Sequence, residues 1–103
     1  MTRIEWTEPA VSDLDNIHDY IARDSAEYAD AFVERLIMSA ERLCSFPASG
    51  RVVPEAKDRR IRELLVESYR IIYRVKTGLV QILTVVHGAR DLTRMTPKPW
   101  GQR

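Results

Sequence analysis

The chain has little cysteine and glycine and no long hydrophobic run: its 103 residues include one cysteine and four glycines. A disulfide requires two cysteines, so the lone Cys44 excludes an internal disulfide and a cysteine-based zinc site. No glycine-rich phosphate loop, dinucleotide-binding fingerprint or nucleophile elbow occurs. No apolar stretch approaches the roughly 18 residues of a membrane span, and MTRIEWTEP lacks the apolar region of a signal peptide. We therefore expect a cytoplasmic protein without membrane attachment.

The composition is that of an ordinary folded protein, with 45% hydrophobic and 30% charged residues. A chain of 103 residues has room for one hydrophobic core, so we expect a single domain over residues 1–103. The net charge of +1 conceals an imbalance. Residues 1–50 hold four Lys/Arg and ten Asp/Glu, whereas residues 51–103 hold twelve and five. The basic half either binds an acidic partner, such as nucleic acid or a peptide, or neutralises the acidic half within the fold.

Hydrophobic periodicity predicts helices in the first half and strands in the second. TRIEW alternates as a short strand does, Thr7 can cap a first helix that ends near ARDS, and Ser25 can cap a longer one that Pro47 stops. After this helical hairpin come the predicted strands RIRELLV, YRIIYRVK and LVQILTVVH, joined by turns at Glu67-Ser68 and Thr77-Gly78. Residues 92–103 read as an irregular tail. The pattern predicts an α+β fold in which the helical hairpin packs on the sheet.

The last predicted β-hairpin allows the two faces of the sheet to be assigned. If Lys76 opposes Leu79, one face holds apolar side chains that suit the helical hairpin, namely Tyr73, Val75, Val80 and Ile82. The other face then presents four polar side chains: Arg70, Arg74, Gln81 and His87. We expect this face to be open, with apolar Ile72, Leu83 and Val85 uncovered beside them.

Two readings of this polar face remain open. Arg70, Arg74 and His87 could clamp a phosphate, since arginine donates bidentate hydrogen bonds and histidine titrates near neutral pH. Alternatively, the face is polar only because it is solvated. His18 lies near Asp15 and Asp19 on the first helix, but no further ligands are nearby, so we predict a solvated helix surface and no metal.

The order and spacing of several segments resemble those of the RelE/ParE superfamily of type II toxin–antitoxin toxins. The similarity runs through most of the chain, in PAVSDLDNIHDYIARDS, AFVERLIMSAERLCSFPASGR, PE, IREL, YRIIYRV and VVHGARD. The resemblance implies two helices packed on a twisted antiparallel sheet, a cognate antitoxin as partner, no cofactor, and operator DNA contacted only through the antitoxin.

The superfamily contains two classes of toxin. RelE-like toxins cut mRNA on the ribosome, and four residues here match their catalytic set: Glu55 as general base, Arg70 and Arg90 to stabilise the phosphorane, and His87 as general acid. ParE-like toxins bind and poison DNA gyrase and have no established active site.

Features of the sequence favour the ParE-like class. Many RelE-like enzymes carry lysines on the strand before YRIIY, where this chain has IRELLVES. Many also carry a tyrosine after the last arginine, where this chain has DLTRMTPKPW. RelE-like toxins are often strongly basic, whereas this chain has a net charge of only +1. We therefore predict a gyrase poison, with an mRNA nuclease and a non-toxic co-repressor as alternatives. The predicted binding surface consists of Arg62, Arg70, Arg74, Gln81, His87 and Arg90.

Overall fold

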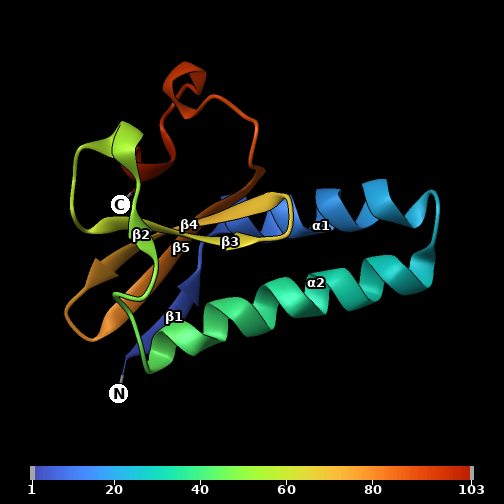
Figure 1. The fold of residues 1–103 in the computed structure, drawn as a ribbon, viewed down its shortest axis with the longest axis horizontal. Helices are drawn as coiled ribbons and strands as arrows, with labels where there is room; N and C mark the ends of the chain where they lie inside the picture. The colour runs from blue at the N-terminus through green and yellow to red at the C-terminus, as the bar shows by residue number, and fades with distance from the viewer. Residues whose placement is uncertain (1, 103) are drawn as a thin grey trace.

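A computed structural model describes residues 2–102 and shows two helices against a five-stranded sheet (Figure 1). The strand order across the sheet is β1-β5-β4-β3-β2. The elements are β1 (Arg3–Trp6), α1 (Glu8–Ala22), α2 (Ala26–Glu41), β2 (Arg51–Val52), β3 (Ile61–Val66), β4 (Tyr69–Lys76) and β5 (Leu79–His87). The predicted α+β class and helical hairpin are confirmed.

The sheet is mixed, because β1 pairs with β5 in parallel whereas β2 to β5 are antiparallel neighbours. The helical hairpin carries the chain from β1 to the opposite edge of the sheet, where β2 begins. This long connection allows β1 to pair with β5, the last strand in the sequence, which runs in the same direction. The expectation of an entirely antiparallel sheet is therefore corrected at this one pair.

The predicted capping residues begin both helices. The Thr7 hydroxyl oxygen accepts from the Ala10 N–H at 3.4 Å, and Ser25 Oγ accepts from the Tyr28 N–H at 3.1 Å. Thr7 also donates its hydroxyl to the carbonyl of Ile82 at 2.7 Å, which ties the start of α1 to β5. The second helix ends at Glu41, and a 3₁₀ turn at Arg42–Cys44 continues it toward Pro47.

The main core lies between the helices and one face of the sheet. Its buried side chains include Leu14 and Leu36 from the helices and the predicted sheet residues Tyr73, Val80 and Ile82. Burial of each such side chain contributes about 1.5–3 kcal/mol. This assignment of the helix-covered face is confirmed.

One close contact at the edge of this core requires a glycine. The fully buried Tyr73 hydroxyl accepts from the Gly50 N–H at 2.9 Å. A Cβ at Gly50 would lie 2.5 Å from that oxygen and 2.4 Å from the Glu63 carbonyl oxygen, so no larger residue fits without movement. The loop between α2 and β2 is thus held against the sheet.

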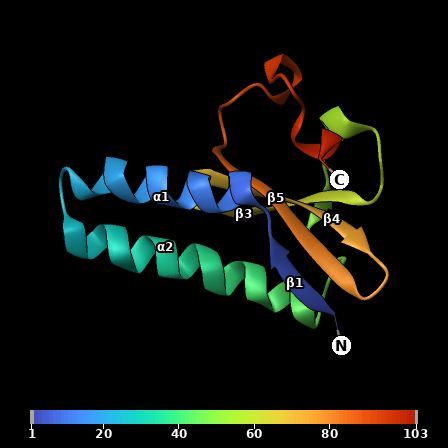
Figure 2. The same ribbon diagram turned by 180° about the vertical axis from the view of Figure 1, so that it is seen from behind.

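The C-terminal tail covers the other face of the sheet (Figures 1 and 2). It contains two short 3₁₀ segments, Leu92–Arg94 and Pro99–Gly101, and otherwise has the irregular backbone expected. A second apolar cluster forms beneath it from Val53, Ile61, Ile72, Leu83, Val86 and Leu92, with Ala56, Met95 and Trp100 packed against it. The prediction that Ile72 and Leu83 are uncovered is therefore wrong. Within residues 2–102, no helix has the length and hydrophobicity needed to cross a membrane.

The two helices are also joined on their solvent side by His18. Its Nε2 lies 2.6 Å from Asp30 Oδ1, and its Nδ1 lies 3.8 Å from Asp19 Oδ1. The hydrogen bond with Asp30 raises the pKa of His18 above its ordinary value. The helix surface at His18, predicted to be solvated, thus carries a contact between α1 and α2.

We expect the His18–Asp30 pair to make stability depend on pH. Because the pKa of His18 is raised in the folded state, its stabilisation is complete below the ordinary histidine pKa and disappears as pH rises through the raised value. The melting temperature of His18→Gln should therefore fall below that of the wild type at about pH 5.5 and approach it at about pH 9. Asp30→Asn should remove the same pH dependence. An equal difference at both pH values would contradict this expectation.

Candidate functional site

A β-bulge in β5 determines which residues share a face of the sheet. Ile72 pairs with Thr84, whereas the next residue, Tyr73, pairs with Ile82, so Leu83 has no partner residue on β4. An extra residue of this kind shifts the alternation of side chains by one position.

The bulge moves His87 away from the predicted polar face. His87 lies directly opposite Tyr69 on β4, and the two rings meet edge to face on the helix side of the sheet at 5.5 Å between centroids. Val85 likewise packs into the helix-side core. Arg70 remains on the tail side, so the prediction that His87 shares its face is wrong. Val85, expected on the open face, is buried under the helices.

Side chains from two distant segments satisfy the backbone groups around the bulge. Asp13 of α1 accepts from the Val85 N–H at 3.0 Å and from the Thr84 hydroxyl. Gln102 in the tail donates its Nε2–H to the Leu83 carbonyl at 2.9 Å. Because unpaired buried backbone groups are costly, these contacts stabilise the bulge and fix α1 and the tail to it.

Arg70 is buried inside a cluster of charges on the tail side. It is 6% exposed, and its Nε donates to Oε1 of Glu63, itself 1% exposed, at 2.6 Å. Its Nη1 and Nη2 lie 3.2 and 3.3 Å from the carboxylate oxygens of Glu55. Arg51 forms an ion pair with the other oxygen of Glu63. Two arginines and two glutamates therefore neutralise one another at this point.

Glu55 is ionised in this arrangement. The hydrogen bond from Arg70 lowers the pKa of the Glu55 carboxyl below its ordinary value. A lowered pKa keeps the group in its charged form but weakens it as an acceptor of protons at neutral pH. The structure thus brings Glu55 and Arg70 together, as an ion pair.

Arg74 and Gln81 lie on the same face as Arg70 and are covered by the tail. The Arg74 Nη1 donates to the carbonyl oxygen of Gln102 at 2.7 Å and to Gln81 Oε1 at 3.2 Å, and its Nη2 donates to the Trp100 carbonyl. Arg74 is 9% and Gln81 is 4% exposed. The prediction of an open polar face is wrong, because Arg74 binds the tail backbone and Arg70 and Gln81 are buried as well.

The remaining predicted residues lie at the periphery. Arg62 donates to the Gly50 carbonyl at 2.8 Å and so holds the loop after α2. His87 and Arg90 are exposed at the two ends of one turn, in which the Arg90 N–H donates to the His87 carbonyl at 3.0 Å. Of the six residues predicted to form a binding surface, only these two are exposed, and no metal-binding group of three His, Cys, Asp or Glu side chains occurs within residues 2–102.

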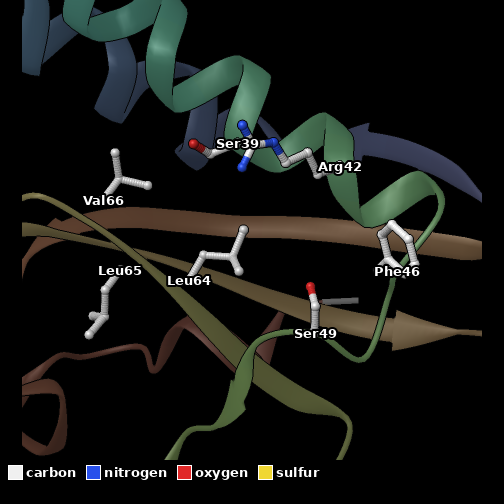
Figure 3. A pocket seen from close by; sticks show the side chains of 7 residues that line it. All are labelled: Ser39, Arg42, Phe46, Ser49, Leu64, Leu65 and Val66. Carbon is white, nitrogen blue, oxygen red and sulfur yellow. The ribbon is translucent and has the colours of Figure 1, made fainter.

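A groove that the sequence did not reveal lies between the end of α2 and β3 (Figure 3). Its volume is about 340 Å³, and it is lined by Ser39, Arg42, Phe46, Ser49, Leu64, Leu65 and Val66. Phe46 is 68% and Leu65 is 60% exposed, which are high values for large apolar side chains. Strand β2 pairs with β3 only at Arg62 and Glu63. The outer edge of β3 beyond Glu63 has no strand partner among the described residues.

A second pocket, also missed, lies where the helical hairpin passes the end of the sheet. It is lined by Tyr20, Ile21, Tyr28, Phe32, Glu67, Ser68, Tyr69 and His87. The available signal was the position of Tyr20 and Tyr28, which flank the short link between the helices.

Comparison with known proteins gives consistent matches. Residues 4–92 match the family model described as ParE toxin of type II toxin-antitoxin system, parDE. The chain is 37% identical over 91 residues to Toxin RelE2 of Caulobacter vibrioides, covering 87% of this chain and 99% of that protein. It is 38% identical over 87 residues to Putative toxin Y4kP of Sinorhizobium fredii, covering 82% and 86%.

A solved structure agrees with these sequence matches. A chain of the chromosomal ParDE TA system from P. aeruginosa superposes with a TM-score of 0.71 at 28% identity, covering 84% of this chain and 96% of that one. The family model extends over most of the chain, from β1 to the start of the tail. The chain therefore belongs to the ParE toxin family of the RelE/ParE superfamily of type II toxin–antitoxin systems.

Proposed function

We propose that this protein is a toxin that arrests growth by binding and poisoning DNA gyrase, without cutting RNA, and that a cognate antitoxin neutralises it in the cytoplasm. The antitoxin would also provide all contacts with operator DNA. The observation that carries the proposal is the burial of Arg70. An arginine that stabilises a phosphorane must reach the phosphate, yet here Glu63 and Glu55 already bind its guanidinium.

Two further features support binding rather than catalysis. Glu55, the residue in the position of a general base, has a lowered pKa because it is paired with Arg70. His87, in the position of a general acid, lies on the opposite face of the sheet from Arg70. A phosphate could not contact both side chains in this arrangement of β4 and β5.

The nuclease remains the second candidate, for one specific reason. His87 and Arg90 are exposed beside one another at the end of β5, and a relative bears the name Toxin RelE2. In a nuclease, a histidine can donate a proton to the leaving oxygen and an arginine can bind the phosphate, and this pair would provide both groups.

Brief induction of the toxin in cells should separate the two classes. We expect gyrase–DNA cleavage complexes to accumulate in these cells and to induce the SOS response. Purified toxin should inhibit supercoiling by purified gyrase. Mapping of mRNA ends from the same cells should show no new cleavage sites. Codon-phased cleavage of ribosome-bound mRNA, with supercoiling unaffected, would overturn the proposal, and absence of growth arrest would indicate the non-toxic co-repressor.

Substitutions at His87 and Arg70 should test the role of chemistry directly. We expect His87→Gln to remain toxic at matched protein levels, since it keeps a polar side chain and removes no chemical step. In a nuclease, loss of the general acid would lower the cleavage rate about 10²–10⁴-fold.

Arg70→Ala should lower the free energy of unfolding by about 3–5 kcal/mol, measured in urea, because the buried Glu63 carboxylate would lose one of its two arginine partners. A stable Arg70→Ala protein that had lost only toxicity would favour the nuclease.

We also propose that the antitoxin binds along the groove between α2 and β3. The unpaired edge of β3 can accept an extended segment by backbone hydrogen bonds, and the exposed Leu65 and Phe46 can pack against apolar side chains of that segment. Arg42 lines the same groove, and Arg62 and Arg51 lie beside it in β3 and β2, so an acidic segment is the best match.

A charge introduced into the groove should separate neutralisation from toxicity. Leu65→Glu places a negative charge where an acidic segment would dock, so antitoxin affinity should fall by about 10-fold or more while toxicity persists. Val11→Glu is the matched control, because Val11 is also an exposed apolar residue, at 45%, but lies on α1. The measurements are growth during co-expression and binding by calorimetry. If Leu65→Glu and Val11→Glu bind the antitoxin with equal affinity, the antitoxin does not bind along this groove.

A further inference from the structure

The pocket at the end of the helical hairpin is lined mainly by aromatic rings. The hairpin extends past the β3–β4 turn, so the ends of α1 and α2 project beyond the sheet (Figures 1 and 2). Side chains from this projection and from the end of the sheet line an open pocket of about 290 Å³, just below the roughly 300–1,000 Å³ typical of ligand pockets. The pocket is separate in its lining residues from the α2–β3 groove.

Four rings follow one another across this aromatic pocket. Tyr28 stacks on Phe32 with centroids 6.2 Å apart, Phe32 is tilted against Tyr69 at 5.4 Å, and Tyr69 meets His87 edge to face at 5.5 Å. Tyr20 adds a further ring and is 65% exposed. Phe32 is buried and supports the other rings from below, whereas Tyr20, Tyr28 and His87 are exposed. Exposed aromatic rings bind cations through their negatively charged faces.

Charge around the aromatic pocket also favours a cation. Residues 8–41, which form the hairpin, contain nine Asp/Glu and two Arg. Glu67 contributes a carboxylate to the pocket lining, where it accepts from the Tyr28 hydroxyl at 3.2 Å and pairs with Arg35. The hairpin is therefore strongly negative, in contrast to the arginines beside the α2–β3 groove.

The chain itself provides one example of the contact. The guanidinium carbon of Arg23 lies 5.7 Å from the centroid of the Tyr20 ring, within the distance of a cation–π interaction. The ring most exposed at the mouth of the pocket thus already attracts a guanidinium group.

We propose that the aromatic pocket binds the side chain of an arginine or lysine presented by the toxin's target protein. The naming of the target as the partner rests on the proposed function, whereas cation binding rests on the rings and charges alone. The two surfaces then divide by charge: the α2–β3 groove suits an acidic antitoxin segment, and the acidic hairpin suits a basic side chain. Target and antitoxin would contact different residues.

Cation binding can be measured without any partner protein. Purified toxin is titrated by NMR with N-acetylarginine amide and with N-acetylcitrulline amide, which has nearly the same shape but no charge. We expect the resonances of Tyr28, Tyr69 and His87 to shift with the arginine compound at millimolar concentration and to remain in place with the citrulline compound. Tyr20→Leu should weaken arginine binding about two- to fivefold, and Tyr20→Phe should not. Equal responses to both compounds, or none to either, would overturn the proposal.

The assignment to the target is tested with purified gyrase and purified antitoxin. Combined Tyr20→Leu and Tyr28→Leu substitutions keep apolar bulk but remove two rings, and should reduce gyrase inhibition at least about fivefold while antitoxin affinity stays within about twofold. The pair Tyr20→Phe and Tyr28→Phe should keep most of the inhibition, and melting temperatures show that each variant folds. Unchanged inhibition, or a larger loss of antitoxin binding, would overturn the assignment. If the wild type does not inhibit gyrase, the proposed function fails while the arginine titration still decides whether the pocket binds cations.

Discussion

The β-bulge at Leu83 determines which side chains of the last strand face the helices and which face the tail. The extra residue reverses the alternation, so His87 meets Tyr69 on the helix side of the sheet and does not share a face with Arg70. The bulge also leaves backbone groups that Asp13 of α1 and Gln102 of the tail bind. Segments from the two ends of the chain are therefore held to the sheet at one irregular point, and the faces of the sheet beyond that point follow from it.

The same bulge explains why part of the site could not be predicted. Helix periodicity, capping by Thr7 and Ser25 and the alternation of β4 located most of the elements and the helix-covered face, because each depends on neighbouring residues alone. A bulge depends on contacts between residues distant in sequence. Assigning the residues of LVQILTVVH alternately to the two faces of the sheet therefore does not reveal it. The tail is irregular, as its sequence predicts, but Leu92, Met95 and Trp100 also carry an apolar signal for its packing over Ile72 and Leu83. The groove and the aromatic pocket arise between elements and have no local signature.

The buried charges on the tail side link several segments of the fold. Arg70 and Glu63 are almost fully removed from water, and the cost of that removal is offset only while Arg51 and Glu55 complete the pairing. The cluster joins β2, β3, β4 and the turn after β2 through one set of ion pairs. Arg70 stands where the sequence pattern of a nuclease has a catalytic arginine, and in this fold Glu63 and Glu55 bind its guanidinium. The position of a residue in a sequence motif therefore does not by itself establish its chemistry.

The acidic and basic parts of the sequence form different surfaces of the fold. The two open explanations were neutralisation between the halves and attraction of an acidic partner, and the structure contains elements of both. Arg35 of α2 pairs with Glu67 at the β3–β4 turn, which links the halves, but most acidic residues of the hairpin are exposed. The acidic hairpin projects past the sheet, while Arg42 and Arg62 lie near the unpaired edge of β3. A small protein with two surfaces of opposite charge can bind two partners of opposite charge, because neither partner competes for the surface that suits the other.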